Sequence, residues 1–342
     1  MRVLGIESSC DDTGLALVTD KRNILAEVRA GQADVHARYG GVVPELAARE
    51  HILALPRLVA AVEDQSGLSL RHDVDAIAVT SGPGLVGGLL TGVQFASGLA
   101  IALGKPLLGI NHLAAHALTP RLTNGVEYPY LLLLASGGHC VWVKVEGPRK
   151  FLELGGTMDD AAGEAFDKIA VLLGLGFPGG PAVEQAAKTG DASRYSLPVP
   201  LAGQSGAKMS FSGLKNAVRL LVQKEHPLDT KKKSDIAAAF QATVCAHLTQ
   251  RAAWVCAQHP DVPTLALAGG VASNHALRAE LCVVAKRFGK TCVVPPSGLC
   301  TDNGAMIAWC GVEWLAAGVQ DSVPLTVRPR WPLGQLYSGL YN

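Results

Sequence analysis

The segment VLGIESSCDDTGLALVTD, residues 3–20, has the pattern of two β-strands joined by a tight polar loop. Its ends are short runs of apolar, β-prone residues, and its middle is rich in residues that favour turns. The segment YLLLLASGGHCVWVKVEG, residues 130–147, repeats this plan about 127 residues later. The repetition predicts two related halves, each built around a strand, a loop and a second strand.

Helices are predicted between and after these strands. A third apolar strand, in TLALAGGVASNHAL at residues 264–277, ends at two glycines and leads into a helix. Apolar residues at helical spacing predict further helices over residues 44–63, 159–173, 234–258 and 303–317. Because strands alternate with helices, the chain is predicted to have an α/β fold. The polar, turn-rich residues 120–129 are the expected domain boundary.

The composition is that of a folded chain with little overall charge. Hydrophobic residues make up 49% of the 342 residues, which excludes a disordered chain. The net charge of +1 predicts that any contact with nucleic acid comes from a local patch or from a partner chain. The N-terminus shows no secretory apolar region, and no two of the eight cysteines form a CxxC pair. We therefore expect reduced thiols and a cytoplasmic protein.

One uncharged stretch, residues 85–104, is long enough to span a bilayer. It contains five glycines together with Thr91, Gln94 and Ser97, and no cluster of basic residues flanks it. These features disfavour insertion into a membrane. The stretch is therefore predicted to be a core helix, and no membrane span is expected.

Three loops at strand ends are candidate ligand sites. Residues 7–14 crowd carboxylates and hydroxyls between two strands, as in a site for phosphate, a metal or a reacting amine, or as in a solvated turn. The loops at residues 135–139 and 268–274 contain paired glycines that permit close approach of an anion or a nucleotide. The sequence has no P-loop and no GxGxxG motif, which disfavours the corresponding ATPase and Rossmann folds.

The motif NHLAAH contains two histidines, His112 and His116, at a spacing that puts both side chains on one face of a helix. Such a pair can bind one metal ion, or it can be two unrelated histidines. Zinc proteases of the HExxH type need a Glu directly after the first His, and this chain has Leu113 there. Asp302 is a candidate third ligand, although its place before a helix favours a capping role on local grounds.

Together these motifs resemble the TsaD family of bacterial type. The matching segments extend from residue 5 to residue 333: GIESSCDDTG, YGGVVPELAAREH, SGPGLVGGLL, NHLAAH, ASGGH, DDAAGEAFDK, GFPGGP, MSFSGLK, AGGVASN, CTDNGAMIA and VRPRWPL. Members of the family transfer the threonylcarbamoyl group of threonylcarbamoyl-adenylate to an exocyclic amine in tRNA, and AMP is released. The acceptor is the adenosine beside the anticodon in tRNAs that read ANN codons. The resemblance implies this acyltransferase activity.

The resemblance also implies a fold and a set of site residues. The fold is that of the actin-like ATPases, with related α/β subdomains around a central cleft, formed by residues 1–125 with 310–342 and by residues 126–309. One divalent metal ion, iron in the usual description with zinc as the alternative, is held by His112, His116 and Asp302. Asp11 is the implied catalytic residue. The implied contacts to the adenylate come from Leu134, Ala135, Ser136, Gly137, Gly138, Asp167, Gly180 and Asn274.

The implied partners are the tRNA anticodon loop, the TsaB and TsaE proteins, and a TsaC-type enzyme that supplies the adenylate; the isolated chain could also form a homodimer.

Two positions differ from other relatives. Leu134 replaces a Tyr that is an extra metal ligand in archaeal and eukaryotic relatives, and Asp12 replaces a common Glu. Two alternative functions are an actin-like nucleotide-binding scaffold and a metallopeptidase that acts on glycoproteins.

Overall fold

The computed structural model describes residues 1–37, 39, 41–319, 321 and 324–336. The chain divides into two compact units. The first unit comprises Met1–Glu127, Glu146–Phe151 and Thr301–Asn342, and the second comprises Tyr128–Val145 and Leu152–Cys300. Residues 337–342, which the sequence assigns to the first subdomain, lie outside the described residues.

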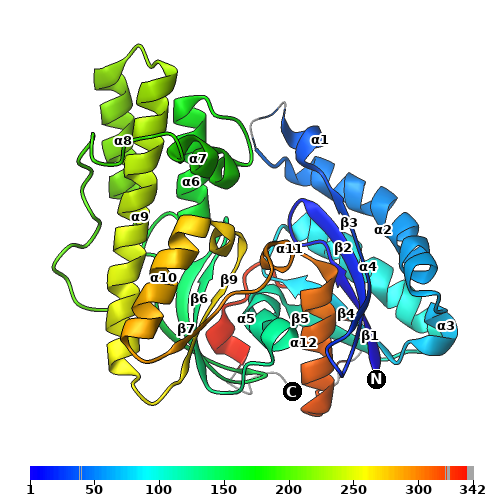
Figure 1. Ribbon diagram of the computed structural model, residues 1–342. Helices are drawn as coiled ribbons and strands as arrows, with labels where there is room; N and C mark the ends of the chain where they lie inside the picture. Colours follow the sequence, from blue (N-terminus) through cyan, green and yellow to red (C-terminus); the bar gives the residue numbers. More distant parts are fainter. Residues whose placement is uncertain (38, 40, 320, 322–323, 337–342) are drawn as a thin grey trace. The chain divides into compact units, whose positions relative to one another are not determined.

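The sheet of the first unit is an antiparallel meander extended by two parallel strands (Figure 1). Its order is β3-β2-β1-β4-β5, with the bounds β1 Arg2–Glu7, β2 Asp12–Thr19, β3 Ile24–Gly31, β4 Ala76–Gly82 and β5 Leu107–Asn111. The pairs β1–β2 and β2–β3 are antiparallel, whereas β1–β4 and β4–β5 are parallel. The strand-loop-strand predicted at residues 3–20 is confirmed as β1, a short loop and β2.

The sheet of the second unit has the same plan. Its order is β10-β9-β6-β7-β8, with the bounds β6 Tyr130–Ala135, β7 Cys140–Gly147, β8 Lys150–Gly156, β9 Thr264–Ala268 and β10 Thr291–Val293. Here β6 pairs antiparallel with β7 and parallel with β9, and β9 is parallel to β10. β6 therefore corresponds to β1 and β7 to β2, which confirms the predicted relationship between the two halves.

Helices follow or connect these strands in both units. Those of the first unit are α1 Ala33–Ala37, α2 Pro44–Ser66, α3 Leu70–Asp73, α4 Val86–Leu103, α5 His112–Asn124 and α12 Gly304–Ala316, with the 3-10 turn η2 Leu333–Leu336. Those of the second unit are α6 Ala162–Leu173, α7 Gly179–Ala187, α8 Ser212–Glu225, α9 Thr230–Gln258, α10 His275–Arg287 and α11 Ser297–Cys300, with the 3-10 turn η1 Gly270–Ser273. The helices predicted over residues 44–63, 234–258 and 303–317 are confirmed.

The helix predicted over residues 159–173 begins three residues later, at Ala162. Asp159 was expected near its N-terminus because the helix dipole favours a carboxylate there. Instead the Asp159 carboxylate accepts hydrogen bonds from Ser210 Oγ at 2.5 Å and from the backbone N–H of Phe211 at 2.8 Å. This long-range contact holds Asp159 outside the helix.

Alternation along β1 sorts its residues between the two faces of the sheet. Leu4 and Ile6 are fully buried and join the apolar core with residues of α2 and α4. Gly5 points to the opposite face, where a Cβ atom would lie 2.3 Å from the backbone N of Ala308 and the backbone O of Gly304. Strand β1 and helix α12 therefore approach so closely that only glycine fits at this position.

Helix α4 corresponds to the uncharged stretch at residues 85–104. Its buried face lies against the first polar loop, since a Cβ at Gly88 would lie 2.3 Å from Ser8 O and one at Gly92 would lie 2.1 Å from Ser8 Oγ. The opposite face exposes Val86, Leu90 and Ile101. Among the described residues, α4 alone has the length and composition of a membrane span. The predicted core helix is thus buried on one face only.

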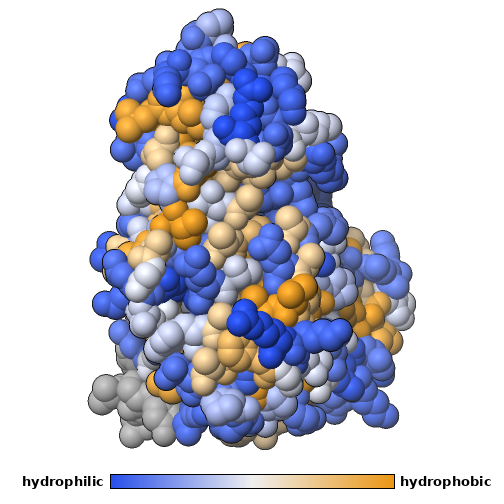
Figure 2. Space-filling view, turned by 60° about the vertical axis from the view of Figure 1, so that its left-hand side comes forward, coloured by the Kyte–Doolittle hydropathy of each residue, from blue (hydrophilic) through white to orange (hydrophobic). Residues whose placement is uncertain are grey.

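Helices α8 and α9 form a hairpin on the second unit. Their buried residues join the core of that unit, with Leu214 and Val218 from α8 and Phe240 and Val244 from α9. Hydrophilic residues dominate the end of the hairpin (Figure 2). The last turn of α8 and the first turn of α9 therefore extend into solvent.

The expectation of reduced thiols is wrong for one pair of cysteines. Cys282 on α10 and Cys292 on β10 form a disulfide, with their Cα atoms 5.1 Å apart. No local motif marks this pair, because the pairing depends on the chain turning back from α10 into β10. The other cysteines of the described chain are free: Cys10, Cys140, Cys245, Cys256, Cys300 and Cys310.

Replacing Gly5 by Ala is expected to destabilise the protein by about 1–3 kcal/mol, because the new methyl group overlaps the backbone of α12. The measurement is the midpoint of urea unfolding followed by circular dichroism. Gly98→Ala is the matched control, since Gly98 lies on the exposed side of α4 and no described atom comes within 4 Å of an added Cβ. That variant is expected to gain up to about 1 kcal/mol from helix propensity. Equal midpoints for Gly5→Ala and the wild type would contradict the packing argument.

Candidate functional site

Helix α5 carries both predicted histidines and begins directly after β5. Asn111 is its N-cap: the side-chain oxygen accepts from the Ala114 N–H at 3.0 Å, and the side-chain NH₂ donates to the Trp331 carbonyl at 2.9 Å. The helical spacing brings the imidazoles of His112 and His116 to a centroid distance of 4.7 Å. Both histidines are buried, as expected for residues that bind something inside the fold.

Asp302 reaches these histidines from the far end of the sequence. Its Oδ1 lies 3.0 Å from His116 Nε2 and 3.5 Å from His112 Nε2, and ligand atoms of the three residues lie within 4.8 Å of one another. The local capping interpretation of Asp302 is wrong. Asn303 caps α12 instead, by accepting from the Met306 N–H at 2.8 Å, so the Asp302 carboxylate is directed at the histidines.

This donor set suits a transition metal. Two imidazole nitrogens and one carboxylate oxygen are the ligands of many iron(II) and zinc sites, which leave further positions for substrate or water. A hard cation such as Mg²⁺ prefers oxygen ligands. The three residues therefore form a candidate site for one divalent iron or zinc ion.

The structure adds Glu7 to this cluster, a residue that the sequence placed in the first candidate loop but did not connect with the histidines. Its side chain is fully buried, and its Oε2 lies 3.0 Å from His112 Nδ1 and accepts from Thr80 Oγ1 at 2.6 Å. Its Oε1 accepts from the Ser9 N–H at 2.6 Å. The alternation of side chains along a strand places Glu7 on the same face of β1 as Gly5, the face toward α12. This alternation was the one signal in the sequence for the direction of the Glu7 side chain.

Opposite charges stabilise one another in this cluster. Burial opposes ionisation of Glu7, but the neighbouring His112 lowers the pKa of its carboxyl below the ordinary value. Burial likewise opposes the charged form of His112, yet Glu7 and Asp302 raise its pKa to about 9. The pKa of Asp302 is held well below its usual range, against the effect of burial, by His112 and His116. The cluster therefore favours a positive charge between its two carboxylates.

The first loop, residues 8–11, is held from several directions. Leu85 N donates to Ser9 O at 2.7 Å, and the buried His51 contacts Cys10 O at 3.1 Å and Thr13 Oγ1 at 2.7 Å. His51 was not singled out from the sequence either. These contacts fix the backbone on both sides of Asp11, whose side chain is partly exposed in the same unit as the histidines.

Asp12 differs in its surroundings from Asp11. One of its carboxylate oxygens lies 3.9 Å from Arg29 Nη1 on the neighbouring strand β3. Burial raises the pKa of Asp12 to about 6, while Arg29 acts in the opposite direction. Asp12, which replaces the common Glu, is therefore paired with Arg29 on the neighbouring strand.

The second predicted loop forms a tight turn between β6 and β7 in the second unit. Ser136 N donates to His139 O at 2.7 Å, and Ser136 Oγ accepts from His139 N at 3.2 Å. Gly137 and Gly138 are exposed at the tip. The start of α6 lies against this turn, because a Cβ at Gly163 would meet Ser136 O at 2.6 Å. The turn thus presents backbone atoms beside a helix N-terminus.

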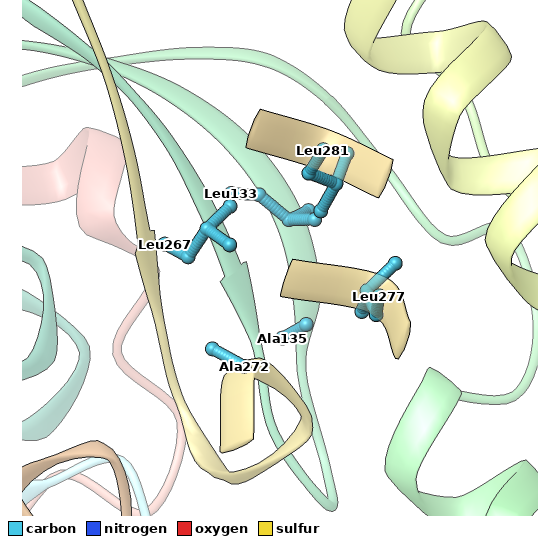
Figure 3. A pocket seen from close by; sticks show the side chains of 6 residues that line it. All are labelled: Leu133, Ala135, Leu267, Ala272, Leu277 and Leu281. Carbon is cyan, nitrogen blue, oxygen red and sulfur yellow. The ribbon is translucent and has the colours of Figure 1, made fainter. Parts of the chain in front are cut away.

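The side chains of Leu134 and Ala135 face the interior. Both residues end strand β6 and are almost completely buried. Figure 3 shows the Ala135 side chain among Leu133, Leu267 and Leu277, around a small apolar gap beneath α10 that has no room for a water molecule. Contact between these two residues and a ligand would therefore involve their main chain.

The remaining predicted substrate residues lie on elements of the second unit that contact one another. Asp167 on α6 accepts from the Gly179 N–H at 2.8 Å, which joins α6 to the start of α7 beside Gly180. Asn274 caps α10 by accepting from Leu277 N, and it donates to Gln241 Oε1 at 2.8 Å. Gly269 links this region to the second loop, since a Cβ there would lie 2.3 Å from Ala135 O.

Comparison with solved structures identifies the fold. The chain is similar to HypF from T. kodakarensis, with a TM-score of 0.63 and 14% identity over 92% of this chain and 48% of that one. It is also similar to (R)-2-hydroxyglutaryl-CoA dehydratase component A from Acidaminococcus fermentans, with a TM-score of 0.54 and 17% identity over 93% and 99% of the two chains. These are actin-like ATPase folds, and the predicted fold class is confirmed.

Sequence comparison identifies the family. The family described as TsaD, tRNA N6-adenosine threonylcarbamoyltransferase, matches residues 23–309. A protein of that name from Paracoccus denitrificans is 56% identical over 97% of this chain and 94% of its own length. One from Paramagnetospirillum magneticum is 51% identical over 97% of both chains. The chain therefore belongs to the TsaD family, and the predicted family, reaction and enzyme class are confirmed.

Replacing His116 by Ala is expected to abolish stoichiometric binding of a divalent ion, because it removes one of three protein ligands. The ion content is measured by inductively coupled plasma mass spectrometry after loading with Zn²⁺ and dialysis. His72→Ala is the control, since His72 is an exposed histidine of the same unit. Equal zinc content in His116→Ala and the wild type would contradict the site.

Proposed function

We propose that the chain transfers the threonylcarbamoyl group from threonylcarbamoyl-adenylate to the adenosine beside the anticodon of ANN-decoding tRNA at a metal-assisted site. The observation that carries this proposal is the convergence of His112, His116 and Asp302 in a chain of the TsaD family. Each of these side chains is held by a specific element: the histidines by a capped helix, and Asp302 by the segment before α12.

The proposed metal is Fe²⁺, with Zn²⁺ as the alternative that the same donor set accepts. When bound, the ion would act as a Lewis acid that polarises the carbonyl of the transferred group. His112 and His116 supply neutral nitrogen ligands, and Asp302 supplies one negative charge. Leu134 stands where the family resemblance gives archaeal and eukaryotic relatives a Tyr ligand, and its aliphatic side chain has no donor atom, so no fourth protein ligand is proposed there.

The second unit is proposed to bind the adenylate through the residues implied by the family resemblance. The backbone N–H groups of Gly137 and Gly138, at the exposed turn that follows Ser136, suit the phosphate, since such turns next to a helix N-terminus attract anions. Gly180 has no described atom within 4 Å of an added Cβ, which leaves space for a ligand beside it. Asp167 and Asn274 are proposed to position these segments through their contacts with Gly179 and Gln241.

Asp11 is the proposed general base. The exocyclic nitrogen of adenine attacks the carbamoyl carbon, and a new C–N bond forms. The bond from that carbon to the phosphate oxygen of AMP breaks, and AMP leaves with the electron pair. The proton of the attacking nitrogen passes to the Asp11 carboxylate. The fixed loop backbone around Asp11 supports this role, because a base must be held at hydrogen-bond distance from the proton it removes.

The two alternative functions have less support. A glycoprotein metallopeptidase of the HExxH type would need a general base after the first histidine, and the residue there, Leu113, is buried and apolar. A nucleotide-binding scaffold without group transfer would have no use for a two-histidine, one-carboxylate cluster. The metal cluster therefore favours the transferase over both.

The test is transfer of label from threonylcarbamoyl-adenylate to an ANN-decoding tRNA, with Fe²⁺ and the partner proteins present. His112→Ala is expected to abolish transfer, and Asp11→Asn is expected to reduce it by about 10²–10⁴-fold, the usual contribution of a general base. Asp20→Asn is a control for a surface carboxylate of the same unit. Full activity of His112→Ala would contradict the metal assignment, and nucleotide-dependent tRNA binding without transfer by the wild type would favour the scaffold.

The proposed protein partners are TsaB and TsaE, with a TsaC-type enzyme as the source of the adenylate, and the proposed compartment is the cytoplasm.

An exposed apolar surface on α2 and α4 supports a protein contact. Ile52 and Leu53 on α2 are 59% and 60% exposed, and Val86 and Leu90 on α4 are 55% and 45% exposed. The two helices pack together, because a Cβ at Gly87 would lie 3.0 Å from Ala48 Cβ. In the absence of TsaB, a second copy of the chain is proposed to cover this surface as a homodimer.

Leu90→Asp is expected to weaken binding to TsaB by about tenfold or more, because it places a charge in an apolar contact. Size-exclusion chromatography of mixtures with TsaB, with light scattering on each chain alone, measures both assemblies. Val171→Asp is the matched control, since Val171 is an exposed apolar residue of the second unit with 68% exposure. Normal co-elution of the Leu90→Asp variant would contradict the proposed surface.

A further inference from the structure

We propose that Glu7 is a positioning residue that selects Nε2 of His112 as the metal-binding atom. The inference rests on the proposed metal site and concerns a residue outside the predicted ligand set. It follows from three features of the structure: the hydrogen bond between Glu7 and His112, the contacts that immobilise Glu7, and the balance of charge around the site.

The hydrogen bond determines which imidazole nitrogen is available. Glu7 Oε2 lies 3.0 Å from His112 Nδ1, and an ionised carboxylate can only accept hydrogen bonds. Nδ1 therefore carries the hydrogen, and the lone pair of the neutral ring lies on Nε2. That nitrogen faces Asp302 Oδ1 at 3.5 Å, on the side where His116 Nε2 also lies. Glu7 thus directs the lone pair of His112 toward the other two ligands.

Glu7 can orient His112 because Glu7 itself is immobilised. Thr80 Oγ1 donates to the same oxygen that meets His112, at 2.6 Å, and Ser9 N–H donates to the other oxygen, also at 2.6 Å. Ser9 Oγ lies 3.2 Å from His112 Nδ1 and is a second, weaker contact for that nitrogen. A carboxylate fixed at both oxygens leaves the imidazole plane little freedom to rotate.

His116 lacks such an anchor. Its Nδ1 is buried and has no hydrogen-bond partner among the described residues, so the ring is oriented by packing and by the contact of its Nε2 with Asp302 Oδ1 at 3.0 Å. The two histidines therefore play unequal parts. His112 has its tautomer set by a hydrogen bond, and removal of Glu7 should affect His112 and leave the surroundings of His116 unchanged.

Glu7 also completes the charge balance. With both histidines neutral, Asp302 and Glu7 carry two negative charges, which balance the two positive charges of a divalent cation. The charge of Glu7 acts through the His112 ring and not through a bond to the ion. Carboxylate–histidine–metal arrangements of this kind raise the basicity of the histidine ligand, and their loss commonly costs about 10–100-fold in metal affinity.

The test compares Glu7→Ala and Glu7→Gln with the wild type, using the full chain and Zn²⁺ in competition with a chromogenic chelator. Glu7→Ala is expected to weaken Zn²⁺ binding by about 10–100-fold. Glu7→Gln keeps an acceptor but removes the charge, so its Zn²⁺ affinity is expected to lie between those of the wild type and Glu7→Ala. Thr80→Val is the matched control: it removes one contact of Glu7 and keeps the carboxylate, so its effect should be the smallest. Far-UV circular dichroism verifies that each variant is folded.

A second measurement does not depend on a variant that folds. In the Zn²⁺-loaded wild type labelled with ¹⁵N-histidine, NMR should show hydrogen on Nδ1 and metal on Nε2 of His112. Metal on Nδ1, or Zn²⁺ affinity of Glu7→Ala within twofold of the wild type, would overturn the role of Glu7. Failure of the metal site itself would look different, because Zn²⁺ binding by the wild type would then be absent or insensitive to His116→Ala.

Discussion

The close contact between β1 and α12 is the constraint on which the rest of the first unit depends. Gly5 lets β1, at the start of the chain, lie backbone against backbone with α12, near its end, and Gly304 allows the same close approach between α12 and β2. A side chain at Gly5 would overlap the backbone of α12, and one at Gly304 would overlap the backbone of Leu15 and Ala16 on β2. Because Asp302 directly precedes α12, this contact also brings its carboxylate to the histidines of α5. The geometry of the site is therefore a consequence of how the core is packed.

The cluster of Glu7, His112, His116 and Asp302 is stable as a unit and not as a set of separate residues. An isolated buried charge is very costly, whereas charges that are paired and hydrogen-bonded can be accommodated. Each carboxylate here has an imidazole beside it, and Glu7 has Thr80 and Ser9 as additional donors. Because burying these groups is costly without their partners, the surrounding segments have to be in place for the cluster to form. These segments are the loop at residues 8–11, the start of α4 and the N-cap of α5.

The two units use one sheet plan for different chemistry. In the first unit, the loop after β1 carries carboxylates and is held by His51 and by the backbone at Leu85. In the second, the turn after β6 carries glycines and exposes its backbone. The strand that precedes each loop is almost fully buried and supplies rigidity. The differing loops then determine whether the position offers side chains or main-chain groups to a ligand.

The sequence by itself determined the α/β class, the repeated strand-loop-strand segments, most of the helices and the HxxxH pair, because these depend on periodicity and on neighbours within a few residues. It did not determine the role of Asp302, for which local rules favoured a cap, or the part played by Glu7, which lies 105 positions from its partner His112. It also did not reveal the bond between Cys282 and Cys292, or that one face of α4 is exposed. Only the tertiary structure decided these, since each depends on which distant segment packs beside the residue.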